Sequence, residues 1–252
     1  MEPNARHIPT RFVVLFEHRS GSTYLVEALN SHSRIRSEKE LLAVIRGKVE
    51  KGEADPGNQL RCIDKLYVPG NHGYDVIGFK TKIKDILDPV GMARVLKANE
   101  ARVILLQRRN RIKLLVSLIN AMRLNEATGD WNRYDETVQL TPLHIEVGGF
   151  KRELELEDKA NRELNEYARS LGLPVLELHY EDLLADSEEA FRRVCGFLGT
   201  NYEPLEAGTK KNTSDDLRHV VANFDELKAA FAGTAYEPMF DEVMQPQSSA
   251  AK

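Results

Sequence analysis

Apolar residues recur along this chain at two spacings, and segments with these spacings alternate. Short, nearly continuous apolar runs predict strands that are buried on both faces of a sheet, at residues 11–16, 75–80, 102–107 and 174–179. Longer segments with an apolar residue every three or four positions predict helices, at residues 22–31, 39–51, 90–98, 111–125, 151–171, 181–198 and 215–232. Strands that alternate with helices predict an α/β fold, in which helices flank a doubly wound parallel sheet.

The chain is expected to form one domain. Its 252 residues permit one or two domains by length, but no linker, low-complexity block or internal repeat divides them. Residues 1–9 and 245–252 are expected to be flexible ends. The polar stretch 126–149 is too long for a plain connector and is typical of a lid or a wall of a binding site.

Composition narrows the classes of function. The formal net charge of −4 argues against a protein that wraps nucleic acid with a wholly basic surface, but it permits a local basic pocket for a small polyanion. Cys62 and Cys195 are far apart and match no metal-ligand spacing, so reduced thiols are expected. The start of the chain lacks a signal-peptide pattern, and no apolar run approaches membrane-spanning length. We therefore expect a cytoplasmic protein with no integral membrane segment.

The first candidate site follows the strand predicted at residues 11–16. A strand, a tight turn and a helix in this order direct backbone N–H groups and a helix N-terminus toward an anion. Gly21 allows the turn to approach a ligand closely. A cation and three hydroxyl groups surround this glycine, on Arg19, Ser20, Ser22 and Thr23. The turn predicts a site for a phosphate-like group, but it lacks the first glycine and the lysine of the P-loop G-x-x-x-x-G-K-[ST]. The alternative is an ordinary turn between a strand and a helix.

A second candidate site follows the strand predicted at residues 102–107. Arg109 lies at the end of this strand, and Ser117 follows eight residues later on the next helix. Eight residues are about two helical turns, so Ser117 can face the turn. A guanidinium and a hydroxyl that converge there would clamp one phosphate. The alternative is a solvated arginine and a serine on the helix surface.

These motifs together resemble those of the sulfotransferases that use 3′-phosphoadenosine-5′-phosphosulfate (PAPS). Residues 19–24, which read RSGSTY, resemble the loop that binds the 5′-phosphosulfate. Arg109 and Ser117, with Asn110 after the arginine, resemble the element that binds the 3′-phosphate. Residues 173–184 resemble the strand and Tyr-Glu-Asp-Leu turn of the family, and residues 209–212 resemble its basic C-terminal loop. The matches extend from about residue 11 to about residue 240.

The resemblance implies a P-loop NTPase-like sulfotransferase fold and the transfer of a sulfuryl group from PAPS. The acceptor would be a hydroxyl, or alternatively an amine, of a small molecule, a carbohydrate or a glycolipid, and no metal would be needed. Residues that would bind PAPS are Arg19, Ser20, Gly21, Ser22, Thr23, Tyr24, Arg109, Ser117, Tyr180, Lys210 and Lys211. Tyr180 would lie against the adenine. Tyr24 would stack on the adenine or, alternatively, pack in the core.

Catalysis would depend on Arg19, Lys80 and Glu40. Lys80 ends the second predicted strand and would place a cation beside the transferring group, with Lys82 as the alternative. The family resemblance favours a carboxylate base soon after the first helix, and Glu40 is the better placed candidate, before Glu38. Partial desolvation, when the acceptor closes the pocket, would raise the pKa of this carboxyl toward a useful range. The alternative is a capping box, because Ser37 and Glu40 have the S-x-x-E spacing of a helix start.

Two other classes of protein are compatible with parts of this pattern. A P-loop-type kinase would share the sheet and the first turn, but the missing lysine and the Arg109–Ser117 pair argue against it. A non-catalytic nucleotide-binding module would have no need of Lys80 and Glu40. The identity of the acceptor remains open at this level.

Overall fold

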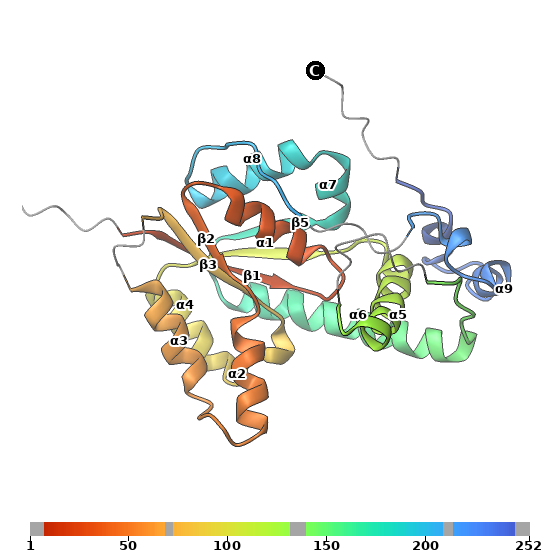
Figure 1. The fold of residues 1–252 in the computed structure, drawn as a ribbon, viewed down its shortest axis with the longest axis horizontal. Coiled ribbons are helices and arrows are strands. Elements are labelled where there is room, and N and C mark those ends of the chain that lie inside the picture. The colour runs from red at the N-terminus through yellow and green to blue at the C-terminus, as the bar shows by residue number, and fades with distance from the viewer. Residues whose placement is uncertain (1–7, 69–72, 132–139, 209–213, 245–252) are drawn as a thin grey trace, which may run out of the picture.

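In the computed structural model, which describes residues 8–68, 73–131, 140–208 and 214–244, five strands form one sheet (Figure 1). The strands are β1 (Thr10–Phe16), β2 (Ile35–Glu38), β3 (Val76–Thr81), β4 (Arg102–Gln107) and β5 (Val175–His179). Their order is β2-β3-β1-β4-β5, and each neighbouring pair is parallel. Helices cover both faces of this sheet, which confirms the expected fold class.

Figure 1 shows α1, α7 and α8 on one face of the sheet and α2, α3, α4 and α6 on the other. The helices are α1 (Ser22–Ser31), α2 (Leu41–Glu50), α3 (Asn58–Tyr67), α4 (Pro89–Ala98), α5 (Arg111–Thr128), α6 (Val147–Ser170), α7 (Tyr180–Ala185), α8 (Ser187–Leu198) and α9 (Phe224–Ala229). Short 3₁₀ segments are η1 (Ile83–Asp85), η2 (Leu217–His219) and η3 (Glu237–Phe240).

The strand β1 is buried on both faces, which explains its unbroken apolar sequence. Alternate side chains of a strand point to opposite faces. Phe12, Val14 and Phe16 therefore pack with α1, α7 and α8, whereas Val13 and Leu15 pack with α2, α3, α4 and α6. The neighbouring strand β3 has a glycine, Gly78, where a Cβ atom would overlap the ring of Phe12.

A third apolar cluster lies beyond the carboxyl end of the sheet. It joins α5 and the start of α6 to the C-terminal segment, through Ile112, Phe150 and Phe240 among others. A backbone bridge between Leu143 and Val221 ties the stretch before α6 to the same segment. The C-terminal segment is thereby held against α5, the helix that carries Ser117.

Several elements differ from the sequence-based prediction. The edge strand β2 was not predicted, because it has four residues that alternate between buried and more exposed positions. The helix α3 was also not predicted. The helix expected at residues 181–198 is two helices, because Asp186 caps α8 by accepting a hydrogen bond from the Glu189 N–H. The helix expected at residues 215–232 is reduced to η2 and α9.

Some predictions concern residues outside the described part of the chain. The expected flexible ends lie outside it except for Ile8 and Pro9, and so do residues 132–139 of the stretch 126–149. Among the residues that are described, no helix combines the length and the apolar character that crossing a membrane requires.

Candidate functional site

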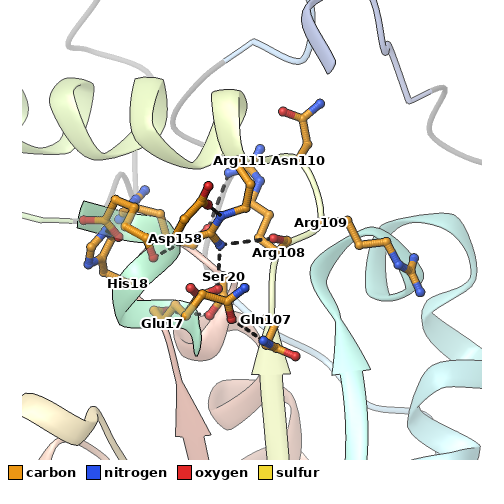
Figure 2. A network of polar contacts seen from close by, with 12 residues as sticks. Glu17, His18, Ser20, Gln107, Arg108, Arg109, Asn110, Arg111 and Asp158 are labelled. Carbon is orange, nitrogen blue, oxygen red and sulfur yellow. Dashed lines mark hydrogen bonds and ion pairs between the residues drawn. The ribbon is translucent and has the colours of Figure 1, made fainter. Parts of the chain in front are cut away.

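The carboxyl ends of β1, β3, β4 and β5 meet at one edge of the sheet, because all of these strands are parallel. Two connections from that edge lie side by side in Figure 2: the β1–α1 loop (residues 17–21) and the β4–α5 turn (residues 108–110). In doubly wound sheets, ligands bind at this edge, where neighbouring connections go to opposite faces. The two motifs that the sequence singled out are thus brought together.

The β1–α1 loop has the left-handed backbone that a close approach to an anion requires. Arg19 has φ of 57° and Gly21 has φ of 85°. Gly21 is the N-cap of α1, so the free N–H groups of the first helical turn follow it. The hydroxyl of Ser20 is buried and donates to the Glu17 carbonyl at 2.6 Å. Ser20 therefore stabilises the turn from within, and its hydroxyl is not a donor to the nucleotide as the sequence suggested.

Tyr180 lies against this loop, and its expected contact with the adenine stays a prediction. It begins α7, directly after β5, and its ring covers Gly21 so closely that a Cβ atom there would be 2.6 Å from Cδ2 of the ring. The guanidinium of Arg108 lies over the same ring, 4.8 Å from its centroid. Burial raises the pKa of the Tyr180 phenol, and the charges of Arg108 and Arg19 oppose that shift.

The structure does not bring Arg109 to Ser117. Arg109 is half exposed and points away from the network in Figure 2, toward α7, where it donates to both carboxylate oxygens of Asp182 at 2.6 and 3.0 Å. Ser117 is buried, and its hydroxyl accepts instead from Nε of Arg19 at 3.1 Å. The predicted clamp is therefore wrong in its arginine, because Asp182 offers Arg109 a bidentate partner on the outer side of the turn.

Arg108 is the cation of this turn that faces the β1–α1 loop. Its side chain is only 7% exposed. Nη1 donates to the Arg19 carbonyl at a long 3.4 Å, and Nε has no hydrogen-bond partner among the described residues. Burial lowers the pKa of this guanidinium, while the charges of Tyr180, Glu181 and other acidic groups oppose the shift. The sequence reasoning missed Arg108, because adjacent arginines look equivalent until the turn directs them apart.

Lys80 lies under the start of α1 and is only 2% exposed. Its ammonium donates to the hydroxyls of Ser22 and Thr23 at 3.3 and 3.1 Å and stands 5.1 Å from the centroid of the Phe16 ring. Its Nζ is also 3.5 Å from Oε1 of Glu40. Burial lowers the pKa of Lys80, and Glu40 opposes that shift. The structure thus brings together three separate parts of the sequence, with Ser22 and Thr23 in the first, Glu40 in the second and Lys80 in the third.

Glu40 is held by two lysines. Besides Lys80, Lys82 forms an ion pair with Oε2 at 2.7 Å. Burial by itself would raise the pKa of the Glu40 carboxyl, but the hydrogen bonds and charges of Lys82 and Lys80 outweigh it and lower the pKa below its usual value. The upward shift of this pKa, which is expected when an acceptor closes the pocket, stays a prediction.

The capping-box alternative for Glu40 is not formed. Ser37 belongs to β2, and Glu40 is itself the N-cap of α2, with no capping hydrogen bond from its side chain. The side chain of Glu40 is turned toward the lysines instead. Since Lys80 is the penultimate residue of β3 and Lys82 directly follows this strand, the carboxylate lies at the carboxyl edge of the sheet.

Tyr24 and His32 both have structural roles. Tyr24 packs against the core of the α1 face, with its ring 5.9 Å from that of Phe191, so the core alternative is the observed one and stacking on adenine is not supported. His32 accepts a hydrogen bond from the Arg34 N–H through Nδ1, while Nε2 is 2.8 Å from the Asn201 carbonyl. Both contacts fix a connection and leave no ring nitrogen for catalysis.

The remaining expectations concern a loop and a metal. Lys210 and Lys211 lie outside the described residues. Within the described ranges, no three His, Cys, Asp or Glu side chains gather where they would hold a metal ion.

No family model matches this chain. It is similar over nearly its full length to Nodulation protein H of Rhizobium tropici, a sulfotransferase, with 26% identity over 253 residues that cover 95% of this chain and 97% of that protein. The chain is related to sulfotransferases.

The solved structures to which the chain shows a likeness are named as sulfotransferases. The sulfotransferase domain from the curacin biosynthetic pathway has a TM-score of 0.48 and 17% identity, covering 79% of this chain and 76% of that one. The sulfotransferase from Alicyclobacillus acidocaldarius has a TM-score of 0.47 and 17% identity, with 92% and 95% covered. The mouse sulfotransferase SULT7A1 complexed with PAP has a TM-score of 0.45 and 13% identity, with 93% and 76% covered.

Proposed function

We propose that this protein is a PAPS-dependent sulfotransferase that transfers the sulfuryl group to a hydroxyl of its acceptor. The bond between sulfur and the bridging phosphate oxygen breaks, a bond between sulfur and the acceptor oxygen forms, and 3′,5′-ADP leaves. The observation that carries the proposal is the position of Lys80. This buried cation contacts the hydroxyls of Ser22 and Thr23 and lies 3.5 Å from the carboxylate of Glu40. The Lys80 cation, the hydroxyl donors for an anion and the carboxylate base therefore lie together at the carboxyl end of β3.

The residues of the β1–α1 loop fit a 5′-phosphosulfate. Charge in such a transfer spreads onto the oxygens of the transferring and leaving groups, so positioning and electrostatic stabilisation supply most of the catalysis. The N–H groups that follow Gly21 and the hydroxyls of Ser22 and Thr23 would hold the phosphate. Arg19 and Lys80 would stabilise its growing charge. Because these donors are fixed before the substrate arrives, little reorganisation is needed during the reaction.

Glu40 is the proposed base for the acceptor proton. Its two lysine partners keep it ionised at neutral pH and fix the direction of its oxygens. A base must lie within hydrogen-bond reach of the proton that it removes. Glu40 and Lys80 lie at the same edge of the sheet, so an acceptor bound there beside the phosphosulfate would be within reach of the Glu40 carboxylate. Glu38 belongs to β2 and pairs with Arg36, so it is the weaker candidate.

The 3′-phosphate is assigned to Arg108 in place of Arg109. A buried guanidinium with an unsatisfied Nε next to the proposed adenine contact, Tyr180, fits a second phosphate of the same nucleotide. Ser117 remains a candidate for the nucleotide site through its contact with Arg19. Lys210 and Lys211 remain predicted contributors to the same phosphate.

The acceptor is proposed to be a small molecule, a carbohydrate or a glycolipid with a reactive hydroxyl. Trp131 supports a flat partner such as a sugar ring. Its carbonyl accepts from Nη1 of Arg19 at 3.2 Å, and the residue is 53% exposed. An exposed indole so near the phosphosulfate loop is suited to stacking on a sugar face.

The decisive experiment supplies labelled PAPS and, separately, labelled ATP with a panel of sugars, glycolipids, phenols and small alcohols. Transfer of label from PAPS alone, undiminished by a chelator, is the expected result, because Arg19 and Lys80 provide the positive field that a kinase obtains from Mg²⁺. Transfer from ATP that stops with chelator and returns with Mg²⁺ would favour a kinase. Binding of nucleotide with transfer to no acceptor would favour a non-catalytic binding module.

A further inference from the structure

A buried network of charges joins the β1–α1 loop to three other elements, and the chemistry proposed above does not use it. Arg111, the first residue of α5, is at its centre and is buried (Figure 2). Its guanidinium donates to Oε2 of Glu17 at 2.9 Å, to Oδ1 of Asp158 at 3.1 Å and to the Glu157 carbonyl at 3.0 Å. A weaker bond reaches the Arg108 carbonyl at 3.4 Å. One side chain therefore contacts both connections of the site and the helix α6.

Glu17 is where this network enters the loop. It follows β1 directly and precedes Arg19, the loop residue with the left-handed backbone. The Glu17 carbonyl is bonded by the hydroxyl of Ser20, and its carboxylate by Arg111. Its other oxygen, Oε1, is buried and has no hydrogen-bond partner among the described residues. Arg111 is thus the described partner that neutralises this buried carboxylate.

The far side of the network reaches the C-terminal segment. Tyr236 donates its phenol hydrogen to Oδ2 of Asp158, the second carboxylate that Arg111 binds. His18, the next residue of the loop, forms a parallel contact, with Nε2 3.0 Å from Oε2 of Glu157. His18 thus contacts this turn of α6 directly, and Glu17 reaches the same turn through Arg111.

We propose that Arg111 is a positioning residue for sulfuryl transfer: by holding Glu17, it fixes the strained β1–α1 loop in the geometry that the transferring group requires. The inference rests on the proposed function but assigns a role to a residue that does not itself need to touch the substrate. A left-handed backbone at a non-glycine residue such as Arg19 persists only where its surroundings hold it. Arg111, Ser20 and Gly21 supply those surroundings, and Arg111 connects Glu17 to α6.

The test compares kcat in Arg111→Met, Arg111→Lys and the double variant Glu17→Gln/Arg111→Met. In Arg111→Met, kcat should fall by about 100-fold, the cost of a misplacement of about 1 Å. Arg111→Lys keeps a charge for Glu17 and should recover part of the rate. The double variant removes the unpaired buried carboxylate and should recover thermal stability but not kcat. Recovery of kcat together with stability would show that Arg111 is merely structural and would overturn the proposal.

Tyr67→Phe is the matched control. The buried hydroxyl of Tyr67 donates to the Phe12 carbonyl at 2.7 Å, at the opposite end of the same strand. Its loss should lower thermal stability without changing kcat. A fall in kcat that tracked stability in this variant as well would contradict a specific positioning role.

Amide hydrogen exchange of residues 17–24 separates this inference from the proposed function, since it needs no turnover. Exchange in the loop should accelerate by at least about tenfold in Arg111→Met, relative to the core strands, and remain unchanged in Tyr67→Phe. Wild-type protein that transfers no sulfuryl group would refute the proposed function, whereas the exchange result would still report on the loop. Unchanged loop exchange in Arg111→Met overturns the positioning role in either case.

Discussion

Replacing Arg108 by alanine should weaken the binding of 3′,5′-ADP far more than replacing its neighbour Arg109. The two side chains have different surroundings. Arg108 is 7% exposed and has no ion pair among the described residues, whereas the side chain of Arg109 is 52% exposed and already bound to Asp182. A buried cation with no carboxylate partner among the described residues is available to a phosphate, and a satisfied surface cation is not.

The expected magnitudes follow from these surroundings. A hydrogen bond to a charged group contributes about 1.5–3 kcal/mol, so losing the Arg108 contact should reduce affinity by about one to two decades. Arg109 would contribute only the long-range attraction of an exposed charge, and exposed pairs are worth about 0.2–1 kcal/mol. Its replacement should therefore reduce affinity by less than about fivefold.

Calorimetric titration with 3′,5′-ADP and with 5′-AMP measures the effect directly. Wild-type protein should prefer 3′,5′-ADP, and this preference should disappear in Arg108→Ala, because 5′-AMP lacks the phosphate that Arg108 would bind. Arg108→Lys keeps the charge and serves as the control for lost packing on Tyr180, and thermal unfolding checks that each variant is folded. If Arg109→Ala abolishes the preference while Arg108→Ala preserves it, the assignment made from the structure is wrong.

Three further predictions concern the base and the loop. Glu40→Gln should keep nucleotide affinity and lower kcat by about two decades or more, because the amide cannot accept the acceptor proton; normal turnover would redirect the search for the base to Glu38. Lys82→Met removes the partner that does most to lower the Glu40 pKa, so the pKa of Glu40 should rise. Activity is lost as pH falls through this pKa, so the acid limb of the kcat/KM profile should move to higher pH. An unmoved acid limb would show that Glu40 does not set it. Gly21→Ala should cost about 1 kcal/mol or more of stability and displace Tyr180, because φ is 85° and the new Cβ would be 2.6 Å from the ring. Calorimetry should then find nucleotide binding at least about tenfold weaker. Wild-type affinity in this variant would show that Tyr180 is not part of the adenine site.

The fold class could be predicted because its evidence is local in the chain. A strand buried on both faces has a continuous apolar sequence, and β1 and β4 were placed to within a residue for that reason. The edge strand β2 has four residues with only alternate positions buried, so its sequence carries little of this signal. Its place in the sheet depends on backbone pairing with β3, a contact between distant residues.

The β1–α1 loop was likewise determined by the sequence itself. Its small residues, its glycine and its position between a strand and a helix are all properties of one short segment. The direction of individual side chains was not determined in this way. Ser20 turned inward to the Glu17 carbonyl, which belongs to the same turn. Tyr24 turned to Phe191, which belongs to α8, a helix far along the chain.

The tertiary structure alone decided which cations and carboxylates meet. Arg108 and Arg109 are adjacent and chemically identical in sequence, but Asp182 of α7 draws one outward, while the other lies over Tyr180. Glu40 is a helix-start carboxylate in the sequence and an ion-paired residue in the fold, because β3 brings Lys80 and Lys82 beside it. An ion pair forms between groups that the folded backbone places within a few ångströms, and no pattern along the chain encodes that distance.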